Sequence, residues 1–346
     1  MRYPKFLEQG GTIGFAAPSY GCTIEPYASA FKSALAKFND MGYKAVIGPN
    51  CYESSGIGIS NKPEKCAEEL MEMYQSADCD VIISCGGGEL MCEILPFMDF
   101  EKIKGAEPKW FLGYSDNTNF TFTSTVLADT AAVYGPCAPT FGMKPWYRSL
   151  HDTWDILTGK TLSVKGYDKW EKESLKSEDD PTAPYNLTEE KKLVLFNGDR
   201  TGKCSYVEMD GRLLGGCLDT LLTLIGTPFD RVDDFNKKYE KDGVIWFLEA
   251  CDLSVLQIRR GLWQMKNAGW FDNAKGFIFG RPYHFDEPEQ GVDRFNAVTD
   301  ILGLLNIPIV MDADIGHLPP SVPVISGAKA RIEVKGSDIS LTYSLD

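Results

Sequence analysis

The chain has 346 residues, 43% of them hydrophobic, and a formal net charge of −14 from 35 Lys and Arg against 49 Asp and Glu. This length suffices for two domains with substantial cores, and the composition is that of a globular protein, not a disordered one. The negative charge repels a nucleic-acid backbone or an anionic membrane surface. We therefore expect neither as a partner, and we expect a small molecule or peptide instead.

The ten cysteines are scattered, with no C-x-x-C pair and no Cys/His cluster. Several lie within apolar runs, as buried free thiols do: Cys85, Cys217 and Cys251. This usage favours a reducing cytoplasm, and we expect no metal site. Residues 1–6 lack the apolar core of a signal peptide, and no apolar stretch reaches membrane-spanning length. The sequence thus predicts a cytoplasmic protein that is not exported.

The first half alternates short apolar runs with amphipathic stretches. This periodicity predicts strands at 12–17, 44–47 and 80–85, with helices at 27–41 and 62–76. Repeated βαβ units predict a doubly wound parallel sheet that binds ligands beyond the carboxyl ends of its strands. We expect three loops to meet at that edge, at residues 17–19, 85–89 and 113–115.

The segment 109–118, K-W-F-L-G-Y-S-D-N-T, ends an apolar run in a Gly-Tyr-Ser turn before a polar stretch that starts a helix. Such a turn lifts the Ser115 hydroxyl out of the sheet and directs backbone N–H groups at an oxyanion formed there. The alternative is that Ser115 only caps the helix. Asn117 replaces the second glycine of G-x-S-x-G, so the pattern does not indicate an ordinary α/β-hydrolase.

A run of three glycines, Gly86 to Gly88, directly follows the predicted strand at 80–85. Glycine lets the backbone approach a substrate closely and donate N–H groups to it. The G-x-G-x-x-G spacing of a dinucleotide site is absent after Gly86. A contribution to an oxyanion hole and a plain strand-to-helix turn both remain consistent with this run.

The composition changes between residues 147 and 202. Within this stretch, 165–190 is rich in charge and proline and carries Tyr167, Trp170 and Tyr185. We interpret 147–202 as a linker and lid between a first domain, 1–146, and a second, 203–346. The aromatic side chains either anchor the segment or stack on a ligand, and anchoring is the simpler interpretation. In the second half we predict strands at 243–248, 276–279 and 307–311 and a helix at 255–267, which make a second α/β domain.

A nucleophilic serine needs a base, and three histidines are present. His151 borders the linker and His284 follows Gly-Arg-Pro, whereas His317 lies in a defined loop after a strand. We favour His317, with a loop histidine that bonds only backbone as the alternative. Glu249, directly after five apolar residues, is the candidate acid that would hold the imidazole. Asp252 competes with it, and Glu249 as the cap of the next helix is a further alternative.

Six short blocks, in order, resemble the LD-carboxypeptidase family of serine peptidases, which includes the microcin C immunity proteins. They are G-T-I-G-F-A-A-P-S at 11–19, G-Y-S-D at 113–116, G-G-C-L at 215–218, L-E at 248–249, G-R-P at 280–282 and G-H at 316–317. The third block departs from the family's G-G-N-L at Cys217. Together the blocks span nearly the whole chain.

The resemblance implies an N-terminal flavodoxin-like domain with the serine, a C-terminal swivelling-type α/β domain with the acid and the base, and a site at their seam. It implies that Ser115 attacks, that His317 is general base and then acid, and that Glu249 orients His317. The oxyanion would be bound by backbone N–H groups of Asp116, Gly86 and Gly87. No metal or organic cofactor is implied, and a homodimer is expected.

Two substrate classes follow from the resemblance. Murein-recycling members cut between an L-centre residue and a terminal D-amino acid, and this is the function that we expect. Immunity members release an aminoacyl group from an aminoacyl-adenylate analogue, and Trp170 would then stack on the nucleobase. Cys-Gly-Gly-Gly at 85–88 replaces the Arg-Gly-Gly-Tyr-Gly of murein-type members, which weighs against that branch.

Two other classes of function remain as rivals. In the first, the chain is a peptide-binding module without turnover. In the second, it is an enzyme like the class I amidotransferases, whose nucleophile is cysteine. Retention of Ser115, Glu249 and His317 favours serine hydrolysis over both.

Overall fold

The computed structural model describes residues 1–198 and 203–346, which divide into two compact units. Unit 1 comprises Met1–Thr161 and Glu173–Asn186, and unit 2 comprises Leu162–Lys172 and Leu187–Asp346. The predicted bounds at 146 and 203 differ from those of these units, because parts of 147–198 belong to each of them. Residues 199–202, the end of the predicted linker, lie outside the described residues.

Unit 1 is built on a parallel sheet with the strand order β5-β4-β3-β1-β2. Its strands are β1 (Thr12–Ala16), β2 (Lys44–Ile47), β3 (Val81–Ser84), β4 (Trp110–Gly113) and β5 (Ala132–Tyr134). The order reverses beside β1, as in doubly wound sheets, so the prediction of such a fold is confirmed. The loops at 17–19, 85–89 and 113–115 all follow carboxyl ends of these strands.

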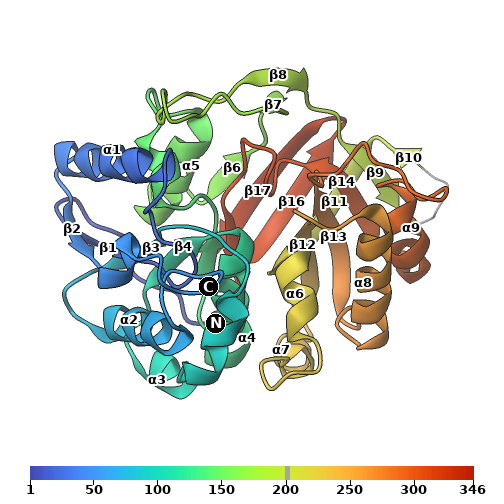
Figure 1. Cartoon of the computed structure of the whole chain (residues 1–346). Coiled ribbons are helices and arrows are strands. Elements are labelled where there is room, and N and C mark those ends of the chain that lie inside the picture. Colours follow the sequence, from blue (N-terminus) through green and yellow to red (C-terminus); the bar gives the residue numbers. More distant parts are fainter. Residues whose placement is uncertain (199–202) are drawn as a thin grey trace. The chain divides into compact units, whose positions relative to one another are not determined.

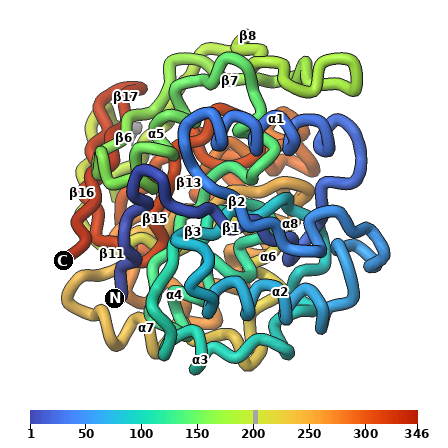
Figure 2. The backbone as a smooth tube through the Cα atoms, turned by 90° about the vertical axis from the view of Figure 1, so that its left-hand side faces the viewer, coloured from blue at the N-terminus to red at the C-terminus, as the bar shows by residue number. Residues whose placement is uncertain are grey.

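Helices cover both faces of this sheet (Figure 1). Figure 2 views the edge with β1, β2 and β3 and shows α1 on one side of them and α2 on the other. The helices of unit 1 are α1 (Tyr27–Asp40), α2 (Pro63–Gln75), α3 (Phe100–Gly105), α4 (Thr118–Ala128) and α5 (Arg148–Leu157).

Aromatic contacts hold these layers together. On one face, Phe38 of α1 lies with its ring centroid 5.9 Å from that of Phe15 in β1 and 5.0 Å from that of Trp154 in α5. On the other face, the ring of Phe120 in α4 lies 4.7 Å from that of Phe111 in β4. Each such pair adds to the burial of apolar area that stabilises a layered domain.

Unit 2 contains a mixed sheet with the order β10-β9-β14-β13-β12-β11-β16-β17-β6, in which β11 to β14 are parallel and the outer strands antiparallel. Its strands are β6 (Ser163–Lys165), β9 (Val194–Asn197), β10 (Lys203–Cys204), β11 (Tyr206–Cys217), β12 (Val244–Glu249), β13 (Ala274–Gly280), β14 (Pro308–Ala313), β16 (Lys329–Lys335) and β17 (Asp338–Ser344). Strands β7 (Lys169–Glu171) and β8 (Leu187–Glu190) form a separate antiparallel pair, and β15 (Val324–Ser326) is short.

The helices of unit 2 are α6 (Leu218–Leu224), α7 (Val232–Lys238), α8 (Val255–Asn267) and α9 (Asn296–Leu302). Strand β12 is buried along its whole length, and the Trp246 ring stacks on that of Trp270 at 5.8 Å between centroids. The predicted helix at 255–267 and the predicted strand at 44–47 have the observed bounds, while the ends of other predicted elements differ by at most two residues. In the part of the chain that is described, no helix is long and apolar enough to cross a membrane.

A buried lysine joins β4, the strand that leads to Ser115, to the end of α2. Lys109 is only 7% exposed, and its Nζ donates to the carbonyl of Met73 at 3.0 Å and to that of Ser76. These carbonyls belong to the last turn and the C-cap of α2, where the helix has no intrahelical donors for them. Burial lowers the pKa of Lys109, and nearby Cys79 and Asp80 act in the opposite direction.

We expect Lys109→Met to lower the free energy of unfolding by about 1–3 kcal/mol, because two buried carbonyls lose their donor. Urea denaturation followed by circular dichroism measures this change. Lys104→Met is the control, since Lys104 is 52% exposed and the substitution should stay within about 0.5 kcal/mol of wild type. Equal stability of the two variants would contradict the capping role.

Candidate functional site

Ser115 lies two residues after the end of β4 and has a φ of +62°, in the left-handed region that residues other than glycine rarely adopt. It opens the short 3₁₀ turn η3 (Ser115–Asn117), which runs into α4. The Ser115 N–H donates to the hydroxyl of Tyr134 at 3.2 Å. A strained serine between a strand and a helix is the geometry of a nucleophile elbow, even though Asn117 replaces the usual second glycine.

The capping alternative for Ser115 does not account for this geometry. The residue that precedes α4 is Asn117, and the residue that precedes η3 is Tyr114. Neither the Tyr114 nor the Asn117 side chain makes a capping hydrogen bond. The conformation of Ser115 therefore needs another explanation than helix capping.

A buried carboxylate next to Ser115 fixes the turn. Asp116 Oδ2 accepts the Ser19 hydroxyl at 2.6 Å and the Met91 N–H at 2.9 Å, and its Oδ1 accepts the Asn119 amide at 2.9 Å. Burial raises the pKa of Asp116, and the three hydrogen bonds act against that rise. Asp116 thus ties the loops that follow β1, β3 and β4 to one another, a role that its sequence context did not reveal.

The glycine run lies against Ser115 within unit 1. The Gly86 carbonyl accepts the Asn117 amide at 2.8 Å and the Ser84 hydroxyl at 3.1 Å. A Cβ added at Gly87 would lie 3.0 Å from the Ser115 Cβ and 3.2 Å from its Oγ. Only glycine at position 87 therefore lets the backbone approach Ser115 this closely. The oxyanion role of Gly86, Gly87 and the Asp116 N–H stays a prediction.

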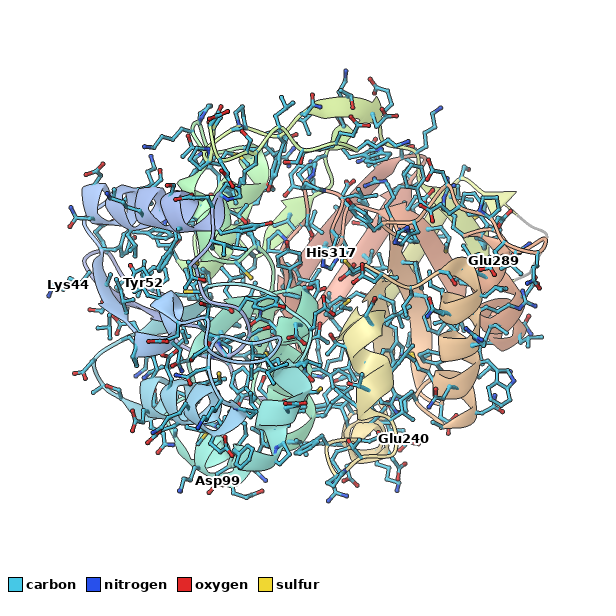
Figure 3. The ribbon with its side chains drawn as sticks, in the orientation of Figure 1. Lys44, Tyr52, Asp99, Glu240, Glu289 and His317 are labelled. Atoms are coloured by element: carbon cyan, nitrogen blue, oxygen red, sulfur yellow. The ribbon has the colours of Figure 1, made fainter. Side chains whose placement is uncertain are left out.

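The candidate acid and base meet within unit 2. Glu249 ends β12 and is 0% exposed, and its Oε2 lies 2.9 Å from Nδ1 of His317. His317 lies in the loop after β14 (Figure 3). A Cβ at Gly316, whose φ is +106°, would lie 2.9 Å from the Glu249 Cβ and still closer to Oε2. Only glycine at this position leaves room for the pair.

The electrostatics of the pair favour a charged imidazole. Burial lowers the pKa of His317, but the Glu249 carboxylate and a hydrogen bond with the Cys251 side chain raise it, and the net pKa lies well above the ordinary value. A buried carboxylate without compensation would cost several kcal/mol, and the imidazolium supplies that compensation. The Glu249 carboxylate therefore favours the protonated form of His317.

The competing assignments for these residues do not match the structure. Helix α8 is capped by Ser254, in a capping box with Gln257, so Glu249 is not its cap. The Asp252 N–H donates to Asp219 at 2.8 Å. The other histidines have different surroundings, since His284 Nδ1 lies 3.0 Å from Glu287 and the His151 ring lies against Trp146 in unit 1.

Trp170 lies in β7, in unit 2, and is only 6% exposed. The Arg281 guanidinium lies 4.3 Å from the centre of its ring, and the Phe285 ring meets it edge-on at 5.4 Å. Arg281 in turn pairs with buried Asp314 at 3.2 Å. These contacts agree with an anchor for the segment, and stacking of Trp170 on a nucleobase stays a prediction.

Three features of the site are not evident in the sequence: the Tyr134 hydroxyl at the Ser115 N–H, the Asp116 carboxylate, and the hydrogen bonds of Asp219 to the N–H groups of Cys251 and Asp252. Strand register, which the sequence does not show, places Cys217 opposite Glu249. Among the described residues, no three His, Cys, Asp or Glu side chains are grouped so that they could hold a metal ion.

Two family models match the chain. The LD-carboxypeptidase N-terminal domain matches residues 13–135, which include Ser115, and the LD-carboxypeptidase C-terminal domain matches 210–332, which include Glu249 and His317. The chain belongs to the LD-carboxypeptidase family. It is accordingly a serine-type peptide hydrolase, and the resemblance that the sequence carries is confirmed.

Relatives of this chain fall into both expected branches. The microcin C7 self-immunity protein MccF of Escherichia coli is 27% identical over 97% of this chain and 94% of its own length. A probable murein peptide carboxypeptidase of Bacillus subtilis is 26% identical over 94% of this chain and 90% of its own length. The solved structure of MccF with glutamyl sulfamoyl guanosine has a TM-score of 0.80 at 23% identity and 99% coverage of this chain, 98% of its own, so the fold is shared.

We expect Gly87→Ala to lower the kcat/KM of this hydrolase at least about tenfold, because the new Cβ displaces the Ser115 side chain by some tenths of an ångström. Hydrolysis assays on the purified variant measure this effect. Gly105→Ala, at the end of α3, is the matched control, since a Cβ there meets nothing within 4 Å. If both variants kept wild-type activity, the contact between the glycine run and Ser115 would not matter for hydrolysis.

Proposed function

We propose that the protein is a carboxypeptidase that cuts the bond between an L-centre residue and a terminal D-amino acid in murein-derived peptides, with Ser115, His317 and Glu249 as its triad. The observation that carries this proposal is the buried Glu249–His317 pair, in a chain that also holds a serine in a strained elbow. The proposal requires the two units to bring Ser115 and His317 within hydrogen-bond reach.

In this mechanism the Ser115 Oγ attacks the scissile carbonyl while neutral His317 takes the hydroxyl proton. The tetrahedral oxyanion is bound by backbone N–H groups of Asp116 and of Gly86 or Gly87, and one such donor is worth about 2.7–4 kcal/mol of barrier. His317 then protonates the leaving amine of the D-amino acid. Water attacks the acyl ester on Ser115 with His317 again as base, and the peptide acid leaves.

Glu249 keeps His317 in the useful tautomer throughout this cycle. Its carboxylate accepts the Nδ1 proton, so that the other ring nitrogen faces the reacting groups. The carboxylate also stabilises the imidazolium that forms when Ser115 loses its proton. Because Glu249 is fully buried, water does not screen this interaction.

A second candidate function is hydrolysis of an aminoacyl nucleotide analogue. MccF is named a self-immunity protein, and its solved structures contain glutamyl sulfamoyl guanosine or aspartyl sulfamoyl adenosine. Its likeness to this chain covers as much as that of the murein-type relative. Both reactions transfer an aminoacyl carbonyl from nitrogen to Ser115. A homodimer in the cytoplasm completes the proposal for either substrate.

We expect Ser115→Ala to lower kcat about 10⁶-fold, since the nucleophile is lost. Purified wild type, Ser115→Ala and a control are incubated with a murein tetrapeptide and with an aminoacyl sulfamoyl adenosine. The control is Ser29→Ala in α1, because the exposed Ser29 hydroxyl donates to Glu25 ahead of that helix. Mass spectrometry follows D-alanine release and adenosine release.

Serine-dependent release of D-alanine would support the carboxypeptidase. Cleavage of only the adenosine conjugate would establish the second candidate and overturn the first. Equal turnover by wild type and Ser115→Ala would contradict a serine mechanism. Binding of the peptide by both proteins without turnover of either compound would favour the binding-module class.

The raised pKa of His317 predicts the pH dependence of hydrolysis. Only neutral imidazole accepts the serine proton, so kcat/KM should rise with pH through the His317 pKa, with a midpoint above the ordinary value of about 6.5. Glu249→Gln removes the charge that raises this pKa. Its midpoint should therefore move to lower pH while the maximal rate falls about 10⁴-fold. A midpoint that Glu249→Gln leaves unchanged would contradict the assigned pair.

A further inference from the structure

We propose that Asn117 is a positioning residue whose side-chain amide holds the Gly86–Gly87 peptide in the orientation that an oxyanion hole requires. This inference rests on the proposed function, in which backbone N–H groups of the glycine run bind the oxyanion. It assigns a task to the residue that replaces the second glycine of G-x-S-x-G. The contacts that carry it all lie within unit 1.

The Asn117 amide joins the glycine run to the elbow. Asn117 is 0% exposed, and its Nδ2 donates to the Gly86 carbonyl at 2.8 Å and to the Tyr114 carbonyl at 3.1 Å. An amide nitrogen carries two hydrogens, so both of them are used here. Gly86 follows β3 and Tyr114 follows β4, so one side chain bridges the loops after two neighbouring strands.

Packing alone does not explain an asparagine at this position. Each carbonyl has a second donor, since the Ser84 hydroxyl bonds that of Gly86 at 3.1 Å and the backbone N–H of Asn117 bonds that of Tyr114 at 3.2 Å. The Oδ1 of the amide is buried and has no hydrogen-bond partner among the described residues. A buried acceptor without a donor lowers stability, and leucine would fill the same space without one.

Gly113 leaves the space for this amide. A Cβ at Gly113 would lie 2.8 Å from the Asn117 Cγ and 2.9 Å from its Cβ. Gly113 is the last residue of β4, where an extended backbone accepts any side chain. The contact with Asn117 is therefore what excludes a side chain here. The first glycine of the G-Y-S-D-N turn thus makes room for its last residue.

A peptide between two glycines needs such a hold from outside. Glycine adopts positive and negative φ about equally well, so little resists rotation of the Gly86–Gly87 peptide. This peptide is trans, and a trans peptide directs its carbonyl and its N–H to opposite sides. The bonds to the Gly86 carbonyl therefore also fix the direction of the Gly87 N–H. A rotated peptide would direct a carbonyl oxygen, which repels an oxyanion, to the side where the N–H now points.

Other contacts share this task in a graded way. The Asn117 amide, at 2.8 Å, is closer to the Gly86 carbonyl than the Ser84 hydroxyl, at 3.1 Å. The next peptide is held separately, because the Tyr20 N–H donates to the Gly87 carbonyl at 3.0 Å. We therefore assign the main hold on the Gly86–Gly87 peptide to Asn117 and a supporting one to Ser84.

The kinetic test uses an activated ester of an amino acid and the variants Asn117→Leu, Ser84→Ala and their combination. We expect kcat to fall about 10- to 30-fold in Asn117→Leu and less than about threefold in Ser84→Ala. The double variant should lose about 10²–10³-fold, as for removal of one oxyanion donor, which exceeds the product of the single losses. KM should stay within about twofold, because the oxyanion exists only after attack. Asn117→Ala, which needs no extra space, is the second variant for the same loss.

Asn236→Leu is the matched control. Asn236, in α7 of unit 2, is likewise buried and donates its amide to the Trp270 carbonyl at 3.2 Å. Its Oδ1 also has no partner in the described part of the chain. Asn236→Leu should keep the wild-type kcat. An equal loss of kcat in Asn236→Leu and Asn117→Leu, or a raised KM at unchanged kcat in Asn117→Leu, would overturn the inference.

Crystal structures of the wild type and of the double variant give a readout that needs no substrate. We expect the Gly86 carbonyl to turn away from its wild-type direction once both donors are gone. An unchanged carbonyl would overturn the inference and leave the proposed hydrolysis standing. Wild-type turnover by Ser115→Ala would instead refute the hydrolytic triad and leave the result on the carbonyl intact.

Discussion

A buried carboxylate is the constraint on which the C-terminal half of the site depends. Glu249 ends a strand that is buried along its whole length, so its charge has no access to water and must be compensated by protein groups. His317 supplies that compensation at 2.9 Å, and the glycines at 280 and 316 leave the space for it. The same contact that compensates the buried charge also raises the pKa of the imidazole, which couples the stability of this region to the chemistry of its base.

In the N-terminal half of the site, the constraint is the backbone conformation of Ser115. Ser115 adopts a backbone conformation that is costly for a residue with a Cβ, so the surrounding chain must hold it there. Asp116 does this by accepting hydrogen bonds from the loops that follow β1 and β3, and Gly87 leaves room for the serine side chain. In unit 1, polar interactions thus hold one hydroxyl in place, whereas in unit 2 they hold one imidazole.

The sequence predicted the parallel sheet of unit 1 and the main strands of unit 2 because apolar runs of strand length and amphipathic helices have distinct periods. It also predicted that Glu249 and His317 belong together, through residue type and family resemblance. It did not predict the hydrogen bonds of Asp219 to the turn after β12, because such contacts depend on strand register and loop geometry. Nor did it predict the division of 147–198 between the units. This stretch is rich in charge and its strands are short, so their pairing within unit 2 is not evident from the sequence.

Ser115 and His317 are proposed to act together on one carbonyl. The most direct measurement is rapid acid quench of the enzyme with an activated ester of an amino acid, followed by peptide mass spectrometry. We expect an acyl group on the peptide that contains Ser115, formed at least about 10²-fold more slowly in His317→Gln. An acyl group on another residue, or equal rates of acylation in wild type and His317→Gln, would contradict it.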